Sequence, residues 1–213
     1  MPEGCGHVGT GTSELALTPT DVPSDGRGAS EPETAAWVRR ARAGDEQAFG
    51  LLMERHERMV LRTALRLLGR LDLAQDAAQD TFLRLHKYLH RVDETRELGP
   101  WLYRLVVNAC HDVARRSRSA RLVPLAEADE VEGTGSREVE AGAARAQQRR
   151  LIDAALAMLP EKERAALVLR DVEGLATAEV ARILGSSEGT VRSQVSTARL
   201  KLKRFVEEQG RKS

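Results

Sequence analysis

The feature that most constrains the fold is the run from Glu179 to Leu202, which reads EVARILGSSEGTVRSQVSTARLKL. Its first part places apolar residues at helical spacing, and Gly185 then breaks the helix. Ser186 and Ser187 are suited to cap a second helix, because their hydroxyls accept hydrogen bonds from its first N–H groups. In that helix apolar residues recur at i, i+4, i+7 and i+11: Val191, Val195, Ala198 and Leu202. The pattern predicts a helix-turn-helix.

The second helix of this motif is rich in cations. Between Glu188 and Phe205 the only acid is Glu188, and the bases are Arg192, Arg199, Lys201, Lys203 and Arg204. Neutralising phosphates dominates DNA affinity, so a basic helix suits a reader of the major groove. A helical hairpin with a solvated basic face remains an alternative for this segment taken alone.

Composition favours helices throughout. Only 3% of the 213 residues are aromatic while 31% are charged, which is atypical of strands, and we expect an all-α protein. The net charge of +1 conceals an acidic stretch between two basic segments. Cys5 and Cys110 lie far apart without metal-ligand spacing, which fits a reducing cytoplasm. No apolar run is long enough for a membrane span, and no secretory signal is expected at the N-terminus.

Two small helical domains joined by a flexible linker are expected. Helices are predicted over 33–42, 46–68, 73–89, 101–118, 145–158 and 161–172, with Asp45 and Asp72 as caps of the second and third. The predicted organisation is a disordered tail (1–32), a first domain (33–120), an acidic linker (121–146), a second domain (147–207) and a short tail (208–213).

Two surface patterns in the first domain can each be interpreted in more than one way from these residues alone. One side of the third helix carries a polar stripe, which without context is best interpreted as an ordinary solvated face. Its members are Asp76, Gln79, Asp80 and Arg84. The fourth helix starts with Trp101 and ends in arginines, a combination that suits melted nucleic acid but equally suits a core aromatic with cations at a helix C-terminus.

Catalytic chemistry is disfavoured. His86 and His90 have the i, i+4 spacing of two zinc ligands, but no Glu follows His86, so a surface pair is the better interpretation. The other histidines have no nearby nucleophile arrangement, and Cys110 falls within an apolar helix. No cofactor or metal is predicted.

Three sequence motifs follow one another along the chain and together resemble a known family. They are DLAQDAAQDTF (72–82), PWLYRLVVNACHDVARR (100–116) and LPEKERAALVLRDVEGLATAEVARILGSSEGTVRSQVSTAR (159–199). Together they closely resemble the extracytoplasmic-function (ECF) sigma factors of the sigma-70 family, over about residues 35–118 and 148–206. These are bacterial initiation subunits that direct RNA polymerase to promoters, and the resemblance implies the same role here, at a signal-responsive set of genes.

The resemblance assigns roles in the first domain. The stripe of Asp76, Gln79, Asp80 and Arg84 would dock on the clamp helices of the largest subunit of core polymerase. The connector from Asp93 to Pro100 would bind the −10 element and take up a flipped base, at a cost in unpairing energy. Asn108, Arg115 and Arg116 would hold the same melted element.

In the second domain the resemblance implies that the recognition helix reads the −35 element as duplex. Its groove-facing residues would be Arg192, Ser193, Ser196 and Thr197, with Arg199 on phosphate. Ala176 stands where the family often has a capping Ser or Thr, and Thr177 is expected to replace it.

An anti-sigma factor is the implied inhibitory partner. The runner-up function is a stand-alone helix-turn-helix regulator, which would need a sensor domain that residues 33–118 do not suggest.

Overall fold

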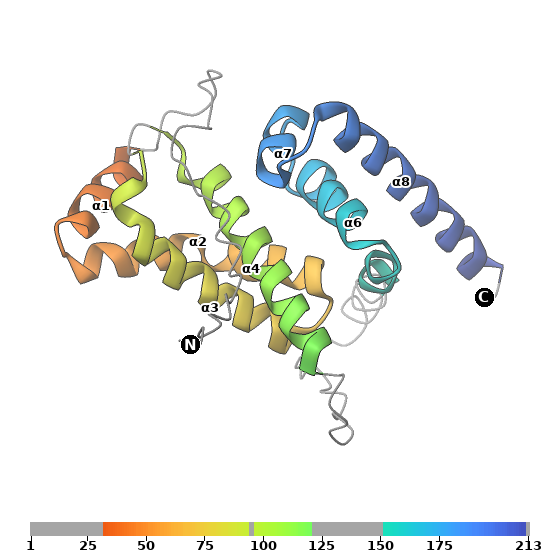
Figure 1. The fold of residues 1–213 in the computed structure, drawn as a ribbon, viewed down its shortest axis with the longest axis horizontal. Helices are drawn as coiled ribbons and strands as arrows, with labels where there is room; N and C mark the ends of the chain where they lie inside the picture. The colour runs from red at the N-terminus through yellow and green to blue at the C-terminus, as the bar shows by residue number, and fades with distance from the viewer. Residues whose placement is uncertain (1–31, 94–95, 121–150, 212–213) are drawn as a thin grey trace, which may run out of the picture.

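The computed structural model describes residues 32–93, 96–120 and 151–211. These residues are almost entirely helical, so the all-α prediction is confirmed (Figure 1). In chain order the elements are α1 (Pro32–Arg42), α2 (Glu46–Leu68), α3 (Leu71–Tyr88), the 3₁₀ turn η2 (Leu89–Arg91), α4 (Leu98–Ala120), α6 (Glu161–Leu167), the π-helical turn η3 (Val168–Val172), α7 (Thr177–Leu184) and α8 (Glu188–Gly210). Residues 151–157 form a further helix before α6. The linker predicted over 121–146 and, except for Pro32, the tail predicted over 1–32 lie outside the described residues.

Several helix ends follow from the residues that were expected to set them. Asp45 and Ser187 occupy the caps of α2 and α8, and each side chain accepts a hydrogen bond of 3.1 Å from the backbone N–H three residues on. Gly69 and Gly185 end α2 and α7 with φ of 71° and 58°. This left-handed conformation strains residues with a Cβ, so glycine is the residue that closes these helices most readily.

Two predicted caps are wrong. α3 begins at Leu71, so Asp72 lies inside the first turn, where it accepts a hydrogen bond of 3.1 Å from Arg70 Nε. α7 already begins at Thr177, so its cap position is Ala176 and the Thr177 hydroxyl lies one residue past that position. The Glu179 carboxylate instead accepts a hydrogen bond of 2.7 Å from the Ala176 N–H. Glu179 therefore supplies only the reciprocal half of a capping box, and no side chain caps the first N–H groups of α7.

The first domain is a bundle of α1 to α4 (Figure 1). On the inner side of α3 and η2, the residues at i+4 steps Ala77, Thr81, Leu85 and Leu89 are all buried, with Leu85 at 0% exposure. Met53 of α2 is 37% exposed and does not belong to the core. α4 contributes more buried residues than any other helix of this domain, which agrees with the apolar residues in its first half. The largest fully buried side chains of this domain are Leu52, Leu85, Leu102, Leu105, Val38, Val60, Val106 and Val107.

The second domain consists of the 151–157 helix, α6, η3, α7 and α8. Val191, Val195 and Ala198 of α8 are buried against α6 and α7, as the sequence predicts. The helix expected over 161–172 changes character at Val168, where one π-helical turn ends with the Glu173 N–H bonded to the Val168 carbonyl at 2.9 Å. Such turns redirect the side chains that follow them, and they recur at functional sites.

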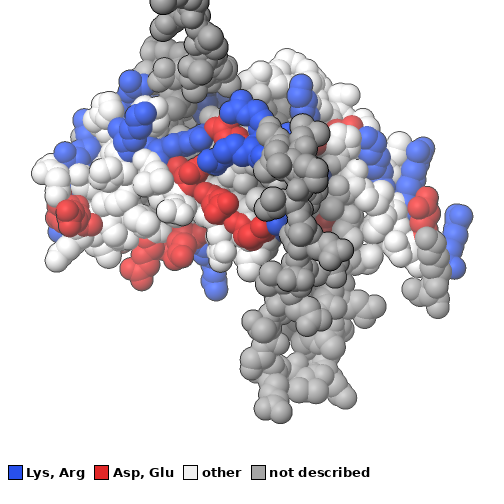
Figure 2. All heavy atoms as spheres, turned by 60° about the horizontal axis from the view of Figure 1, so that its bottom comes forward, with Lys and Arg blue, Asp and Glu red and all other residues white. Residues whose placement is uncertain are grey.

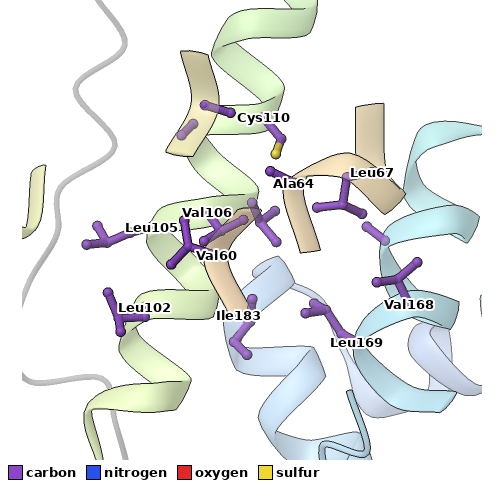
Figure 3. Packing of buried hydrophobic residues seen from close by; sticks show 14 of the residues in the cluster. Val60, Ala64, Leu67, Leu102, Leu105, Val106, Cys110, Val168, Leu169 and Ile183 are labelled. Atoms are coloured by element: carbon purple, nitrogen blue, oxygen red, sulfur yellow. The ribbon is translucent and has the colours of Figure 1, made fainter. Parts of the chain in front are cut away.

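The two domains pack against each other. Figure 3 shows Val60 and Ala64 of α2 and Val106 of α4 facing Leu169 and Ile183 of the second domain. α7 contacts α4, whereas α6 and η3 contact α2, and α8 lies along the outer edge of the molecule (Figure 1). We call this contact between the domains the seam. It forms one apolar cluster with both domain cores.

None of the helices in the described part of the chain combines the length and the hydropathy that crossing a bilayer requires.

Candidate nucleic-acid and protein interfaces

The recognition helix α8 presents the predicted DNA-facing residues to solvent. Arg192, Ser193, Ser196, Thr197 and Arg199 are all exposed, on the side opposite the buried stripe. The Ser187 cap and the Gly185 turn fix the N-terminal end of this helix against α7. The arrangement is that of a helix-turn-helix whose second helix is free to enter a groove.

The arginines of this surface are already paired with carboxylates. Arg192 donates to Glu188 at 2.8 Å, and Arg199 donates two hydrogen bonds of 2.7 Å to Asp171 of η3. These bonds and the charge of Asp171 raise the pKa of Arg199 above its ordinary value. Asp171 lies 28 residues before Arg199, outside the segment from Glu188 to Phe205 in which Glu188 is the only acid.

The polar stripe on α3 also has internal partners. Asp76 and Gln79 are exposed, whereas Asp80 and Arg84 are partly buried. The Asp80 carboxylate accepts a hydrogen bond of 2.6 Å from Arg116 of α4. Arg84 donates to Asp112 of α4 at 2.6 Å. The structure thus joins the stripe on α3 to the basic end of α4 through two ion pairs.

An exposed leucine belongs to the same stripe. Leu83 follows Asp76 by seven residues and Asp80 by three, so it lies on their side of α3, and it is 61% exposed. An apolar side chain rimmed by charges is typical of a protein-binding surface. Helical spacing alone is enough to place Leu83 on this face of α3.

The predicted −10 residues lie on α4. Asn108 is half-buried, whereas Arg115 and Arg116 are exposed near the end of the helix. Asp112 accepts a hydrogen bond of 3.0 Å from Arg115 in addition to its bond from Arg84. Basic and acidic side chains accordingly lie side by side on the face shown in Figure 2. Of the connector from Asp93 to Pro100, residues 94 and 95 lie outside the described residues.

A carboxylate occupies the seam. Glu173 directly follows η3, and its side chain is only 4% exposed. It accepts hydrogen bonds from Thr63 Oγ1 at 3.0 Å, from Arg66 at 2.8 Å and from the Tyr103 hydroxyl at 3.0 Å. Burial and the neighbouring Glu173 charge raise the pKa of Tyr103 well above its ordinary value. Nothing in the sequence distinguishes Glu173 from an ordinary turn residue.

A cavity of about 320 Å³ lies beside the seam, lined by both domains. Glu161 of α6 faces it and pairs there with His111 and Arg118 of α4, each at 3.3 Å. Cys110 also lines it, and burial raises the pKa of this thiol to about 12. A thiol with so high a pKa stays protonated at neutral pH, consistent with the expected place of Cys110 in the core.

One histidine of the first domain, His86, packs against an aromatic ring. The ring of His86 packs edge-on against Phe49, with 5.1 Å between the ring centroids. Among the described residues, no three His, Cys, Asp or Glu side chains are grouped as metal ligands would be.

Two helical domains with a helix-turn-helix in the second are typical of DNA-binding transcription proteins, and comparison with known proteins specifies the family. The model of Sigma-70 region 2 matches residues 52–120, and that of Sigma-70, region 4 matches residues 149–202. The chain is 39% identical to the ECF RNA polymerase sigma factor SigM of Mycobacterium tuberculosis over 77% of its own length and 80% of the relative's. It is 33% identical to the RNA polymerase sigma-H factor of Pseudomonas aeruginosa, over 76% and 88% of the two chains.

Solved structures agree. CnrH in complex with the cytosolic domain of CnrY is similar to this chain with a TM-score of 0.59 and 27% identity, covering 83% of this chain and 99% of the other. The sigma factor RpoE in complex with the anti-sigma factor NepR from Bartonella quintana shares the fold with a TM-score of 0.59, covering 75% and 96% of the chains. This chain belongs to the ECF RNA polymerase sigma factors of the sigma-70 family. A stand-alone helix-turn-helix regulator is not favoured.

Proposed function

We propose that this sigma factor binds core RNA polymerase through α3, holds the melted −10 element with α4 and its preceding connector, and reads the −35 element with α8. The proposed domains are residues 33–120 and 147–207, joined by the acidic segment 121–146. The observation that carries the proposal is the outward face of α8, where all five predicted residues are exposed opposite a buried stripe. Asn108, Arg115 and Arg116 would serve the −10 element.

The proposed role of the α3 stripe is supported by its mixed chemistry. Asp76 and Gln79 are exposed and polar, and Leu83 adds an apolar side chain that water cannot hydrogen-bond. Asp80 and Arg84 would rearrange their pairs with α4 when polymerase binds. Because the Asp80–Arg116 pair is exposed and such pairs contribute only about 0–1 kcal/mol, exchanging this pair costs little.

Promoter melting would draw on binding energy alone. Polymerase supplies the chemistry of RNA synthesis, and the sigma factor stabilises unpaired bases against restacking. Two weak contacts made by one chain reinforce each other through effective concentration. We therefore assign no catalytic group and no cofactor to this chain, and place its action in the bacterial cytoplasm together with polymerase.

An inhibitory protein partner is also proposed. The solved structures of RpoE with NepR and of CnrH with CnrY each contain a protein similar to this chain bound to a partner, and NepR is an anti-sigma factor. By analogy an anti-sigma factor would hold this chain until a signal releases it.

Reconstitution tests the proposal. The purified chain is passed over a sizing column with bacterial core polymerase, and the complex is assayed for run-off transcription on fragmented genomic DNA. We expect co-elution and transcripts that start at a common pair of promoter elements. Tight binding of the free chain to a duplex site, without co-elution, would instead support the stand-alone regulator.

Charge reversal on α3 locates the polymerase contact. Asp80→Arg should abolish co-elution, but it also places two arginines together because Asp80 holds Arg116. Asp76→Arg reverses a charge on the exposed part of the same stripe, and Glu57→Arg makes the same change on α2. We expect both α3 variants to lose polymerase and Glu57→Arg to retain it. Normal binding by Asp76→Arg and Asp80→Arg would mean that polymerase binds another face.

A further inference from the structure

We propose that the cavity beside the seam is a binding site for a small organic anion, a carboxylate with an apolar body. The site goes beyond the proposed function, because the described residues that line it include none of those proposed to bind polymerase or promoter DNA. It can therefore be tested on the free chain, without polymerase or DNA, and its failure would leave the proposed function untouched.

The volume of the cavity sets the size of its ligand. Water in the bulk liquid occupies about 30 Å³ per molecule, so a cavity of about 320 Å³ has room for a ligand of about ten heavy atoms. This volume lies at the lower end of the range of ligand pockets, which is about 300–1,000 Å³. The lining residues come from α2, α4 and α6 and from the start of α3, so a bound ligand would contact both domains.

The buried part of the lining, which we call the floor, is apolar. Leu67, Cys110 and Ala165 belong to it, and none of them is more than 8% exposed. Leu73 and Ala114 add further apolar surface to the cavity. Covering such surface with a hydrocarbon or aromatic group is favourable by about 25 cal/mol per Å². The floor therefore favours a ligand with an apolar body.

The exposed part of the lining, which we call the rim, carries hydrogen-bond donors. His111 and Arg118 of α4 lie there with side chains 47% and 68% exposed, and both meet the Glu161 carboxylate at 3.3 Å. This distance is longer than the 2.7–2.9 Å of close charge-assisted hydrogen bonds. Because a guanidinium has five N–H donors, Arg118 can bind a ligand carboxylate without leaving Glu161.

Arg164 of α6 adds a positive charge that its neighbours satisfy incompletely. Its Nη atoms donate hydrogen bonds of 2.7–2.9 Å to the backbone carbonyls of Leu67, Ala157 and Leu159. Its Nε is buried and has no acceptor among the described residues. Burial lowers the pKa of Arg164 below its ordinary value, and the charge of Glu161 opposes this effect. A bound carboxylate would supply further counter-charge.

The charges around the cavity favour an anion over a neutral molecule. Among the described residues that line it, three are arginines and one, Glu161, is a carboxylate. Arg70 is paired with Asp72, and Arg118 is paired with Glu161. The charge of Arg164 remains in excess, and it attracts negative charge most strongly where protein excludes water.

The first experiment separates the charged head of the ligand from its body. The full-length chain is titrated by isothermal calorimetry with phenylacetate, with phenylacetamide, which has the same shape without the charge, and with acetate, which lacks the ring. We expect phenylacetate to bind at least about tenfold more tightly than either, because only phenylacetate uses both rim and floor. Equal affinity for phenylacetate and phenylacetamide would refute an anion site, and equal affinity for phenylacetate and acetate would refute an apolar floor. No binding of phenylacetate would overturn the site as a whole.

The second experiment assigns the binding to the cavity. Arg118→Gln removes the cation of the rim, and Glu161→Gln removes the carboxylate that competes with the ligand. Arg58→Gln, on the exposed surface of α2 outside the cavity, is the control for Arg118→Gln. We expect the affinity for phenylacetate to fall at least about threefold in Arg118→Gln, to rise in Glu161→Gln and to stay unchanged in Arg58→Gln.

Filling the cavity gives an independent test without a change in charge. Ala114→Leu places a larger apolar side chain in the lining and should abolish binding of phenylacetate, while circular dichroism verifies that the helices are kept. If this variant does not fold, Arg118→Gln and Glu161→Gln still decide the outcome, because both side chains are exposed. Wild-type affinity in Arg118→Gln, or in a folded Ala114→Leu, would mean that phenylacetate binds elsewhere and would overturn the proposal.

Discussion

The seam and the outer surface of α8 both contain arginine–carboxylate pairs, but water has very different access to them. In the pair between Arg66 and Glu173 the side chains are 26% and 4% exposed. In the pair between Arg192 and Glu188 they are 68% and 48% exposed. The distance between the charged atoms is 2.8 Å in both. Burial, not distance, therefore distinguishes the pair that joins the two domains from the exposed pair that would exchange its partner for DNA under the proposed function.

The largest effect is expected where the buried pair is broken from one side. Glu173→Ala leaves the Thr63 hydroxyl, the Tyr103 hydroxyl and Arg66 without the carboxylate that they share. Removing one partner of a buried pair costs several kcal/mol, so the free energy of unfolding should fall by about 3 kcal/mol. Urea denaturation followed by circular dichroism measures the change.

Glu188→Ala is the matched control, because it removes the carboxylate of an exposed pair. It should lower the free energy of unfolding by less than about 1 kcal/mol. Equal losses in the two variants would mean that burial does not distinguish the pairs.

The next effect concerns recognition. Arg192→Ala removes a guanidinium from the exposed face of α8, where it is proposed to contact a base edge. If the contact is bidentate, binding of the −35 duplex should weaken by about 1–3 kcal/mol, mainly through lost discrimination at one base pair. Fluorescence anisotropy with duplexes substituted at each position measures both quantities.

Lys203→Ala is the comparison for Arg192→Ala. Lys203 is exposed further along α8, beyond the proposed base-reading turns. Its removal should weaken all sequences alike and reduce the salt slope by about 1. A uniform loss for Arg192→Ala would assign that arginine to the phosphates instead of the bases.

A smaller effect is expected from Asp171, which neutralises Arg199 with two hydrogen bonds. Asp171→Asn leaves a hydrogen-bond acceptor but removes the charge, so Arg199 becomes available to a phosphate. The plot of log affinity against log salt should become steeper by up to about 0.9, the contribution of one neutralised phosphate. An unchanged slope across several salt concentrations would show that Arg199 does not contact the backbone of DNA.

Much of the fold could be predicted because its determinants are local. Gly69, Gly185, Asp45 and Ser187 each act within a few residues, and the buried stripe of α8 is visible as a helical period. The start of α7 could not be predicted from Thr177, because the Glu179 carboxylate binds the N–H of Ala176 and favours a cap position one residue earlier. Local rules identify the candidates for a cap, and the exact first residue of the helix decides among them.

The partners of the candidate site could not be predicted because they are remote in sequence. Arg199 meets Asp171 across 28 residues, and Arg116 meets Asp80 across 36. The buried position of Glu173 could not be predicted for the same reason, because its donors lie 70 to 110 residues before it. Helical spacing places a side chain on a face of its own helix, but only tertiary packing determines which charge it meets there.

The smallest predicted change tests the exchange of partners directly. Glu188→Gln removes the charge that pairs with Arg192 at 2.8 Å and also removes an acid from the first turn of α8. Exposed pairs at this spacing contribute about 0.3–0.5 kcal/mol, and an acid at a helix start contributes a similar amount. The free energy of unfolding should therefore fall by about 0.6–1 kcal/mol, while affinity for the −35 duplex rises because Arg192 no longer has to leave a carboxylate.

The two effects of Glu188→Gln, lower stability and higher DNA affinity, have opposite signs, and this difference distinguishes two explanations. A substitution that merely loosened the N-terminal turn of α8 would lower stability and DNA affinity together, since Ser187 holds both the cap and the reading turns in place. Combining Glu188→Gln with Arg192→Ala separates the explanations. If Glu188 acts by competing for Arg192, its substitution should increase DNA affinity only when Arg192 is present, and the gain should disappear in the double variant.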